Sequence, residues 1–180
     1  PTGDEREMEV KGRDLVSEVS LALDETGKFL ALRASNLSNV GARCVSLSPL
    51  SKGSGLITGS YDIPCASLRS RAVFSNTMPT QAYRSSGRPE VTFAIERLID
   101  KAARVLGYDR LELRRRNLIA PAKMPYGNAV GAIYDSGEYL ANLERVLHLE
   151  DWAGLAERRA AARRRGKLLG AGFANYVESS

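Results

Sequence analysis

The first half of the chain carries the alternating pattern of β-strands. Between Arg13 and Ala34, larger apolar residues at positions 15, 19, 21 and 23 alternate with small or polar ones, a period of two that is typical of half-buried strands. Asp24-Glu-Thr-Gly27 supplies a turn, and a second run begins at Phe29, so the pattern predicts a β-hairpin. Two further strand-like runs, Ile57–Ile63 and Ser67–Ser75, extend a strand-rich region over 13–78.

The second half has the three- and four-residue spacing of amphipathic helices. From Pro89 to Leu106, apolar residues at positions 91, 94, 95, 98, 102 and 105 form one face. Further helices are predicted over 110–116, with Asp109 as the N-cap, from Ser136 to 149, and over 150–165, where Gly166 ends the helical region 89–165. In the helix from Ser136 to 149, the residues expected to face inward are Leu140, Leu143, Val146 and Leu147.

The end of the chain is a glycine-rich run over 168–178, which predicts a terminal strand with neighbours outside this chain. Antiparallel strands followed by helices define an α+β class. With 180 residues, 43% apolar and 26% charged, the chain has the size and composition of one globular domain, here a single partial domain over 1–180. It has no apolar run of about 18 residues, so no transmembrane helix is predicted.

The cysteine and histidine content excludes several kinds of site. Cys44 and Cys65 lack a CxxC spacing, and His148 stands far from both, so neither a disulfide scaffold nor a zinc site is expected. Both cysteines are predicted to be small buried hydrophobic residues. The chain has no catalytic triad, no GxGxxG fingerprint and no P-loop. The carboxylate pairs Glu90 with Glu96 and Asp135 with Glu138 are predicted to be solvated.

The net charge of +5 is concentrated in two basic clusters, Arg110–Arg116 and Arg158–Lys167. Such clusters fit nucleic acid, a solvated helix face or a surface for an acidic partner. Aromatic residues do not interleave with the arginines, so nucleic-acid binding has little support. A non-catalytic module that binds an acidic partner or polyanion through 158–167 stays open as a function.

The residues with the clearest potential for chemistry lie in a loop over 79–88, which we call the site loop. It contains Gln81-Ala-Tyr-Arg-Ser-Ser-Gly-Arg88 and runs into Pro89, a good first helical residue. Two arginines therefore lie beside the N–H groups and positive dipole of a helix start, which suits a phosphate, a pyrophosphate or a metal oxo group. A plain strand-to-helix turn, with Arg84 paired to a core carboxylate, explains the spacing equally well.

The same run, followed by Ala94-Ile-Glu-Arg-Leu-Ile-Asp100, resembles the molybdenum-binding large subunit of the xanthine dehydrogenase family, and more narrowly its aerobic carbon monoxide dehydrogenase branch. Further segments resemble this family in the same order: Gly12-Arg-Asp14, Tyr61-Asp-Ile-Pro64, Leu113-Arg-Arg-Arg-Asn-Leu118, Met124-Pro-Tyr126, Tyr134-Asp-Ser-Gly137 and Gly170-Ala-Gly-Phe-Ala-Asn-Tyr-Val-Glu178. The resemblance covers nearly the whole chain.

The resemblance implies a molybdenum hydroxylase that oxidises a small molecule with oxygen from water. Its cofactor is a molybdopterin, in bacteria usually the cytosine dinucleotide form. Electrons pass to a 2Fe-2S small subunit and then to an FAD-binding medium subunit, and the large subunit forms dimers. The resemblance also implies a cytoplasmic location, with association at the periphery of the inner membrane.

By resemblance, the site loop lies against the molybdenum centre. Arg84, Ser85 and Ser86 are then expected to line the substrate pocket, and the chain itself supplies no metal ligand. The residues expected to contact the cofactor are Gln81, Ala82, Tyr83, Arg84, Gly87 and Arg88.

The chain departs from the family at two positions of the site loop. Ser85 replaces the cysteine that binds copper in carbon monoxide dehydrogenases, and a hydroxyl is a poor ligand for Cu(I), so copper is not expected. Ser86 replaces a phenylalanine that stacks on purines, so a purine substrate is not expected either. Small aldehydes and aromatic or nitrogen heterocycles remain open.

Two family features are missing from this chain. A Gly-Gly-Phe-Gly type cofactor loop is expected before Pro1, and the glutamate that acts as general base is expected after Ser180. We therefore expect an internal fragment that binds no molybdopterin and has no activity alone.

Overall fold

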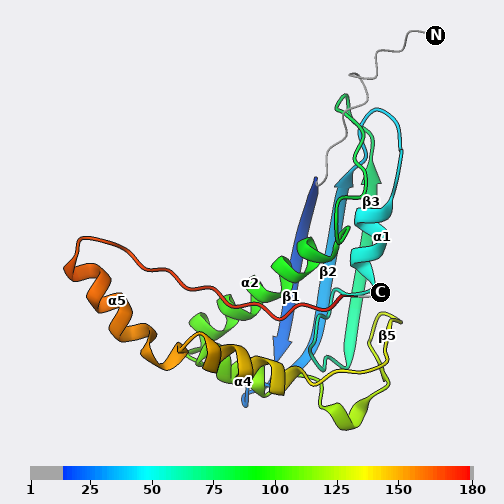
Figure 1. Cartoon of the computed structure of the whole chain (residues 1–180). Coiled ribbons are helices and arrows are strands. Elements are labelled where there is room, and N and C mark those ends of the chain that lie inside the picture. The colour runs from blue at the N-terminus through cyan, green and yellow to red at the C-terminus, as the bar shows by residue number, and fades with distance from the viewer. Residues whose placement is uncertain (1–13, 179–180) are drawn as a thin grey trace.

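The computed structural model describes residues 14–178, and its strands form a mixed sheet (Figure 1). Within this range, β1 (Leu15–Leu23), β2 (Phe29–Asn39) and β3 (Cys65–Val73) lie in the order β1-β2-β3. β1 and β2 pair antiparallel around the turn at Asp24–Gly27, which confirms the hairpin. Strands and helices together confirm the α+β class.

The pairing of β3 corrects the antiparallel arrangement predicted from the sequence, because β3 runs parallel to β2. A short helix, α1 (Ser48–Ser54), lies between β2 and β3 in the sequence. It belongs to the crossover connection that allows the two strands to run parallel. The run Ile57–Ile63 is not a strand; it forms turns, and its apolar side chains are almost fully buried. A short apolar run shows burial but does not distinguish a strand from a buried turn.

Two helices follow the site loop as predicted. α2 (Arg88–Leu106) begins and ends at glycines, and α3 (Arg110–Arg115) is capped by the Asp109 carboxylate, which accepts hydrogen bonds from the N–H groups of Leu111 and Glu112. The next stretch contains the 3-10 turn η2 (Pro121–Lys123) and a small antiparallel pair, β4 (Tyr126–Gly127) and β5 (Ile133–Tyr134).

The last two helices differ from their predicted bounds. α4 (Tyr139–Leu149) begins three residues after Ser136, which does not cap it. The helix predicted over 150–165 is interrupted by Asp151, whose φ of +44° precedes the 3-10 turn η3 (Trp152–Gly154), and α5 (Leu155–Arg164) follows. Among the inward residues predicted for α4, Leu143 and Leu147 are buried, whereas Leu140 and Val146 are exposed.

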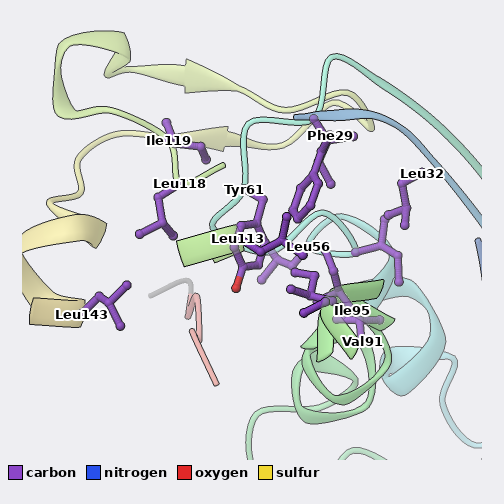
Figure 2. Close-up of a cluster of buried hydrophobic side chains, with 14 of the residues drawn as sticks. Phe29, Leu32, Leu56, Tyr61, Val91, Ile95, Leu113, Leu118, Ile119 and Leu143 are labelled. Carbon is purple, nitrogen blue, oxygen red and sulfur yellow. The ribbon is translucent and has the colours of Figure 1, made fainter. Parts of the chain in front are cut away.

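Helices α1 and α2 lie on the same face of the sheet and enclose the hydrophobic core with it (Figure 1). Figure 2 shows Phe29, Leu32, Tyr61 and Ile95 converging from the sheet, the turns after α1 and α2. The edge-on contact of the Phe29 and Tyr61 rings, with centroids 5.7 Å apart, adds to this packing. Cys44 and Cys65 lie outside the core and are exposed, contrary to the sequence prediction.

A buried asparagine joins the hairpin turn to α3. The Asn117 amide accepts a hydrogen bond from the backbone N–H of Phe29 and donates to the carbonyl oxygens of Gly27 and Leu113, each at 2.8 Å. Three partners satisfy this side chain well, as its complete burial requires.

The segment 168–178 is extended but is not a strand, because it pairs with no strand among the described residues. It runs from α5 back across α2, and its end lies near α1 (Figure 1). Its burial alternates: Ala171, Phe173, Asn175 and Val177 are partly buried, and their neighbours are exposed. A strand also requires a hydrogen-bonded neighbour, so the alternation of burial does not by itself make this segment a strand.

Candidate functional site

The site loop begins at a buried anchor and rises into an exposed tip. The buried Thr80 hydroxyl donates a hydrogen bond of 2.8 Å to the backbone oxygen of Asn39. Residues 81–84 are exposed, and Ser85 is half-buried. We call residues 81–85 the tip. The tip therefore presents Gln81, Ala82, Tyr83 and Arg84 on the surface of this domain.

Two tight turns connect the tip to helix α2. The N–H of Ser86 donates to the oxygen of Tyr83 at 2.7 Å, and the N–H of Arg88 donates to the oxygen of Ser85 at 3.0 Å. Ser85 and Gly87 both have left-handed backbones, with φ of +66° and +85°. Glycine adopts this region freely, whereas serine is strained there.

The strain at Ser85 predicts that Ser85→Gly stabilises the domain. Relief of the left-handed conformation outweighs the extra entropy that glycine gives the unfolded chain, so the free energy of unfolding should rise by about 0.5–1 kcal/mol. Denaturant titration measures the change. The control, Ser51→Gly in α1, should instead lower stability by about 0.5 kcal/mol. A loss of stability in Ser85→Gly would contradict the assignment of strain.

The last residues of the site loop are buried against α1. The hydroxyls of Ser86 and Ser48 are hydrogen-bonded, with 2.9 Å between the oxygens, and Gly87 is also buried. We call Ser86 and Gly87 the base of the loop. The structure thus divides the residues identified from the sequence into an exposed tip and a buried base.

Arg88 points into a neighbouring pocket that the sequence did not reveal. Its guanidinium forms an ion pair with Glu178 in the terminal segment at 2.7 Å. The open pocket, about 610 Å³, is also lined by Lys52, Asp135 and Tyr139. These residues come from distant parts of the chain, so no local pattern could have identified the pocket.

A cluster of polar side chains is buried between α2 and α3. The Arg114 guanidinium is fully buried and bonds the Glu96 carboxylate at 2.7 Å and that of Asp100 at 2.8 Å. The Tyr61 hydroxyl donates to Glu96 at 2.5 Å, and the Asn175 amide donates to Tyr61 at 3.0 Å. This cluster connects α2, α3, the turn after α1 and the terminal segment.

The prediction that Glu96 is solvated is therefore wrong. Burial raises the pKa of Glu96, although Arg114 and Tyr61 act in the opposite direction. Burial and the neighbouring carboxylate also raise the pKa of Tyr61 well above its ordinary value. One signal was present in the sequence: Glu96 lies three residues before Ile99 and seven before Ala103, within the buried stripe of α2.

The first basic cluster of the sequence is largely used within the domain. Besides the buried Arg114, Arg115 pairs with Glu144 at 2.6 Å and Arg116 with Glu112 at 2.9 Å. The second cluster remains exposed at the end of α5, over 163–167. Among residues 14–178, no group of three or more His, Cys, Asp and Glu side chains could hold a metal ion. None of the helices in this range is both long and apolar enough to span a bilayer.

Comparison with known protein families identifies the class of protein. Residues 4–118 match the molybdopterin cofactor-binding domain, and the chain belongs to this family. The family confirms the resemblance seen in the sequence, including that to carbon monoxide dehydrogenase large chains and xanthine dehydrogenases.

Individual relatives are oxidoreductases by name. The chain is 31% identical to the 6-hydroxypseudooxynicotine dehydrogenase complex subunit gamma of Paenarthrobacter nicotinovorans, over 93% of the chain and 22% of the relative. It is 34% identical to the carbon monoxide dehydrogenase large chain of Hydrogenophaga pseudoflava, over 92% and 22%. Quinoline 2-oxidoreductase from Pseudomonas putida 86 superposes with a TM-score of 0.79 and 33% identity, over 87% of the chain and 20% of that structure. The chain thus spans about a fifth of the length of these relatives.

Proposed function

We propose that this chain is part of the catalytic large subunit of a molybdenum-dependent hydroxylase, in which the tip of the site loop faces a molybdopterin cofactor. The observation that carries the proposal is the exposed tip with Arg84, placed directly before the 19-residue helix α2. Membership of the molybdopterin-binding family supports it.

The residues of the tip fit an anionic pterin. Arg84 offers a planar, permanently charged donor, and the start of α2 adds a positive potential. Gln81 and Tyr83 add polar and aromatic surface beside it. When bound, the molybdenum group supplies oxidation of the substrate with oxygen from water. We assign Gln81, Ala82, Tyr83 and Arg84 to contact with the cofactor. We assign Gly87 and Arg88, at the base of the loop and the start of α2, to holding the tip in position for this contact.

The substrate that fits best is a small aldehyde or a nitrogen heterocycle. Ser85 offers no sulfur to Cu(I), so oxidation of carbon monoxide through copper is not part of the proposal. Two of the relatives are named for the oxidation of nitrogen-containing molecules, 6-hydroxypseudooxynicotine and quinoline. The general base, a glutamate, belongs to another part of the subunit in this proposal.

The proposed whole protein works with 2Fe-2S and FAD subunits, as a dimer of large subunits, in the cytoplasm and with the cytosine dinucleotide cofactor. Residues 1–180 are a partial domain in it. An alternative is an acidic partner docked on 158–167, which the exposed arginines at the end of α5 favour.

The test is Arg84→Ala in the full-length protein with its partner subunits. Turnover per molybdenum should fall roughly 10- to 150-fold, the contribution of a hydrogen bond to a charged group. Molybdenum analysis and assays with aldehydes, heterocycles and carbon monoxide measure it. Arg104→Ala, at an exposed position of helix α2, is the control. The proposal would be refuted if the full-length wild-type protein contained no molybdenum, or if Arg84→Ala and Arg104→Ala had equal turnover.

A further inference from the structure

Helix α1 forms a platform beneath the site loop. Its first residue, Ser48, is hydrogen-bonded to Ser86. A Cβ atom added at Gly87 would lie 1.9 Å from the backbone oxygen of Pro49, and one added at Gly53 would lie 2.5 Å from the oxygen of Gly87. Such distances mean that the backbone of α1 touches the backbone of the base, with no side chain between them.

This contact is passed on to the tip through the two tight turns. Ser86 bonds Tyr83 through its N–H, and the next turn closes between Ser85 and Arg88. These two hydrogen bonds, at 2.7 and 3.0 Å, close consecutive turns and limit the freedom of the chain between base and tip. The orientation of Arg84 therefore depends on how the base sits on α1.

The environment of Ser86 separates its role from that of Ser85. Ser86 is only 9% exposed, and its hydroxyl is engaged by Ser48. A buried hydroxyl without a hydrogen-bond partner is destabilising because its desolvation is not compensated, so the bond between Ser86 and Ser48 is favoured. Its side chain is thus occupied beneath the tip, whereas Ser85 is half-buried at the tip itself.

We propose that Ser48 and Ser86 act as a pair of positioning residues that hold the tip, and with it Arg84, in the orientation used toward the cofactor. This inference rests on the proposed function. It assigns Ser86 to positioning in place of the substrate contact that the family resemblance implies, and it gives a function to α1, which the sequence motifs do not include.

The test uses Ser48→Ala, Ser86→Ala and the double variant of the full-length protein. Each single variant should raise the unfolding equilibrium constant about fivefold, and the double variant should do no worse, because both remove the same hydrogen bond. In the loaded enzyme, both single variants should lower kcat several-fold, leave KM unchanged and shift the Mo(V) electron paramagnetic resonance signal in the same way.

Two further variants provide the controls. Ser48→Thr keeps a hydroxyl and should restore the wild-type signal and kcat. Ser51→Ala removes a hydroxyl from the same helix that bonds only the Leu47 oxygen, at 3.1 Å, and should leave kcat and the signal unchanged.

The outcomes separate this inference from the proposed function. The inference would be overturned if the increases in the unfolding equilibrium constant of the two single variants multiplied in the double variant. It would also be overturned if Ser86→Ala changed KM or the Mo(V) signal and Ser48→Ala did not, since Ser86 would then contact the substrate directly. Wild-type protein without molybdenum would refute the proposed function alone, and the stability cycle would still decide whether the two serines are coupled.

Discussion

Replacing Arg114 with methionine is expected to lower the free energy of unfolding by about 3–5 kcal/mol at neutral pH. The reason is that Arg114 is fully buried and neutralises the buried carboxylate of Glu96. Methionine has a similar length but no charge, so Glu96 would keep its burial and lose its counter-ion. Denaturant titration of the two proteins measures the loss.

The matched control for this experiment is Arg115→Met, at the next residue. Arg115 pairs with Glu144 where both side chains are partly exposed, and its loss should change stability by less than about 1 kcal/mol. The double variant Glu96→Gln with Arg114→Met should recover part of the loss, because no charge then stays buried. Equal effects at Arg114 and Arg115 would show that the burial of Glu96 is unimportant.

The loss should also depend on pH. Burial already raises the pKa of Glu96 above its ordinary value of 4.5, and removal of Arg114 raises it further. An acid with a raised pKa in the folded state is favoured there when protonated, so its penalty is absent below pH 4.5 and grows as the pH rises through the folded-state pKa. The difference between Arg114→Met and wild type should therefore shrink at acidic pH.

Gly87→Ala should destabilise the domain by about 3–4 kcal/mol, the sum of the left-handed backbone cost and of overpacking. Its φ is +85°, and the new methyl group would lie 1.9 Å from the Pro49 oxygen and 2.8 Å from the Gly53 nitrogen. Both are backbone atoms, which cannot turn aside as a flexible side chain can. Thermal and denaturant unfolding measure the change.

The other end of α2 provides the comparison. Gly107 has a similar φ of +77°, but nothing lies within 4 Å of an added Cβ. Gly107→Ala should therefore cost only the backbone contribution, about 1–2 kcal/mol. A similar loss at both positions would mean that α1 moves away easily, which would also weaken its assignment as a platform.

Elements whose signals are local could be predicted closely. The hairpin follows from alternation and a four-residue turn, α2 from its apolar stripe, and α3 from the Asp109 cap. The direction of β3 could not be predicted, because it depends on the path that α1 and the buried turns over 55–60 take across the sheet. The interruption of the predicted helix at Asp151 could not be predicted either, since the spacing of apolar residues does not indicate a left-handed backbone.

The candidate site divides in the same way. The site loop was found from its own residues, since two arginines, a glycine and a proline before a helix form one continuous segment. The partner of Ser86 could not be found, because Ser48 lies 38 residues earlier. The cluster around Arg114 joins residues from four segments, and its arginine is one of several in a basic run whose pattern does not distinguish a buried arginine from its neighbours.

The sequence by itself determined the α+β class, the long helix and the position of the loop with Arg84, because each depends on neighbours within about one turn or one hairpin. Only the tertiary structure decided which serine is half-buried at the tip and which is held by α1, and which arginine is buried with Glu96. The physical reason is that burial and desolvation are set by segments far apart in the chain. Identical residue types, such as Ser85 and Ser86, thus acquire different roles from the surfaces that fold against them.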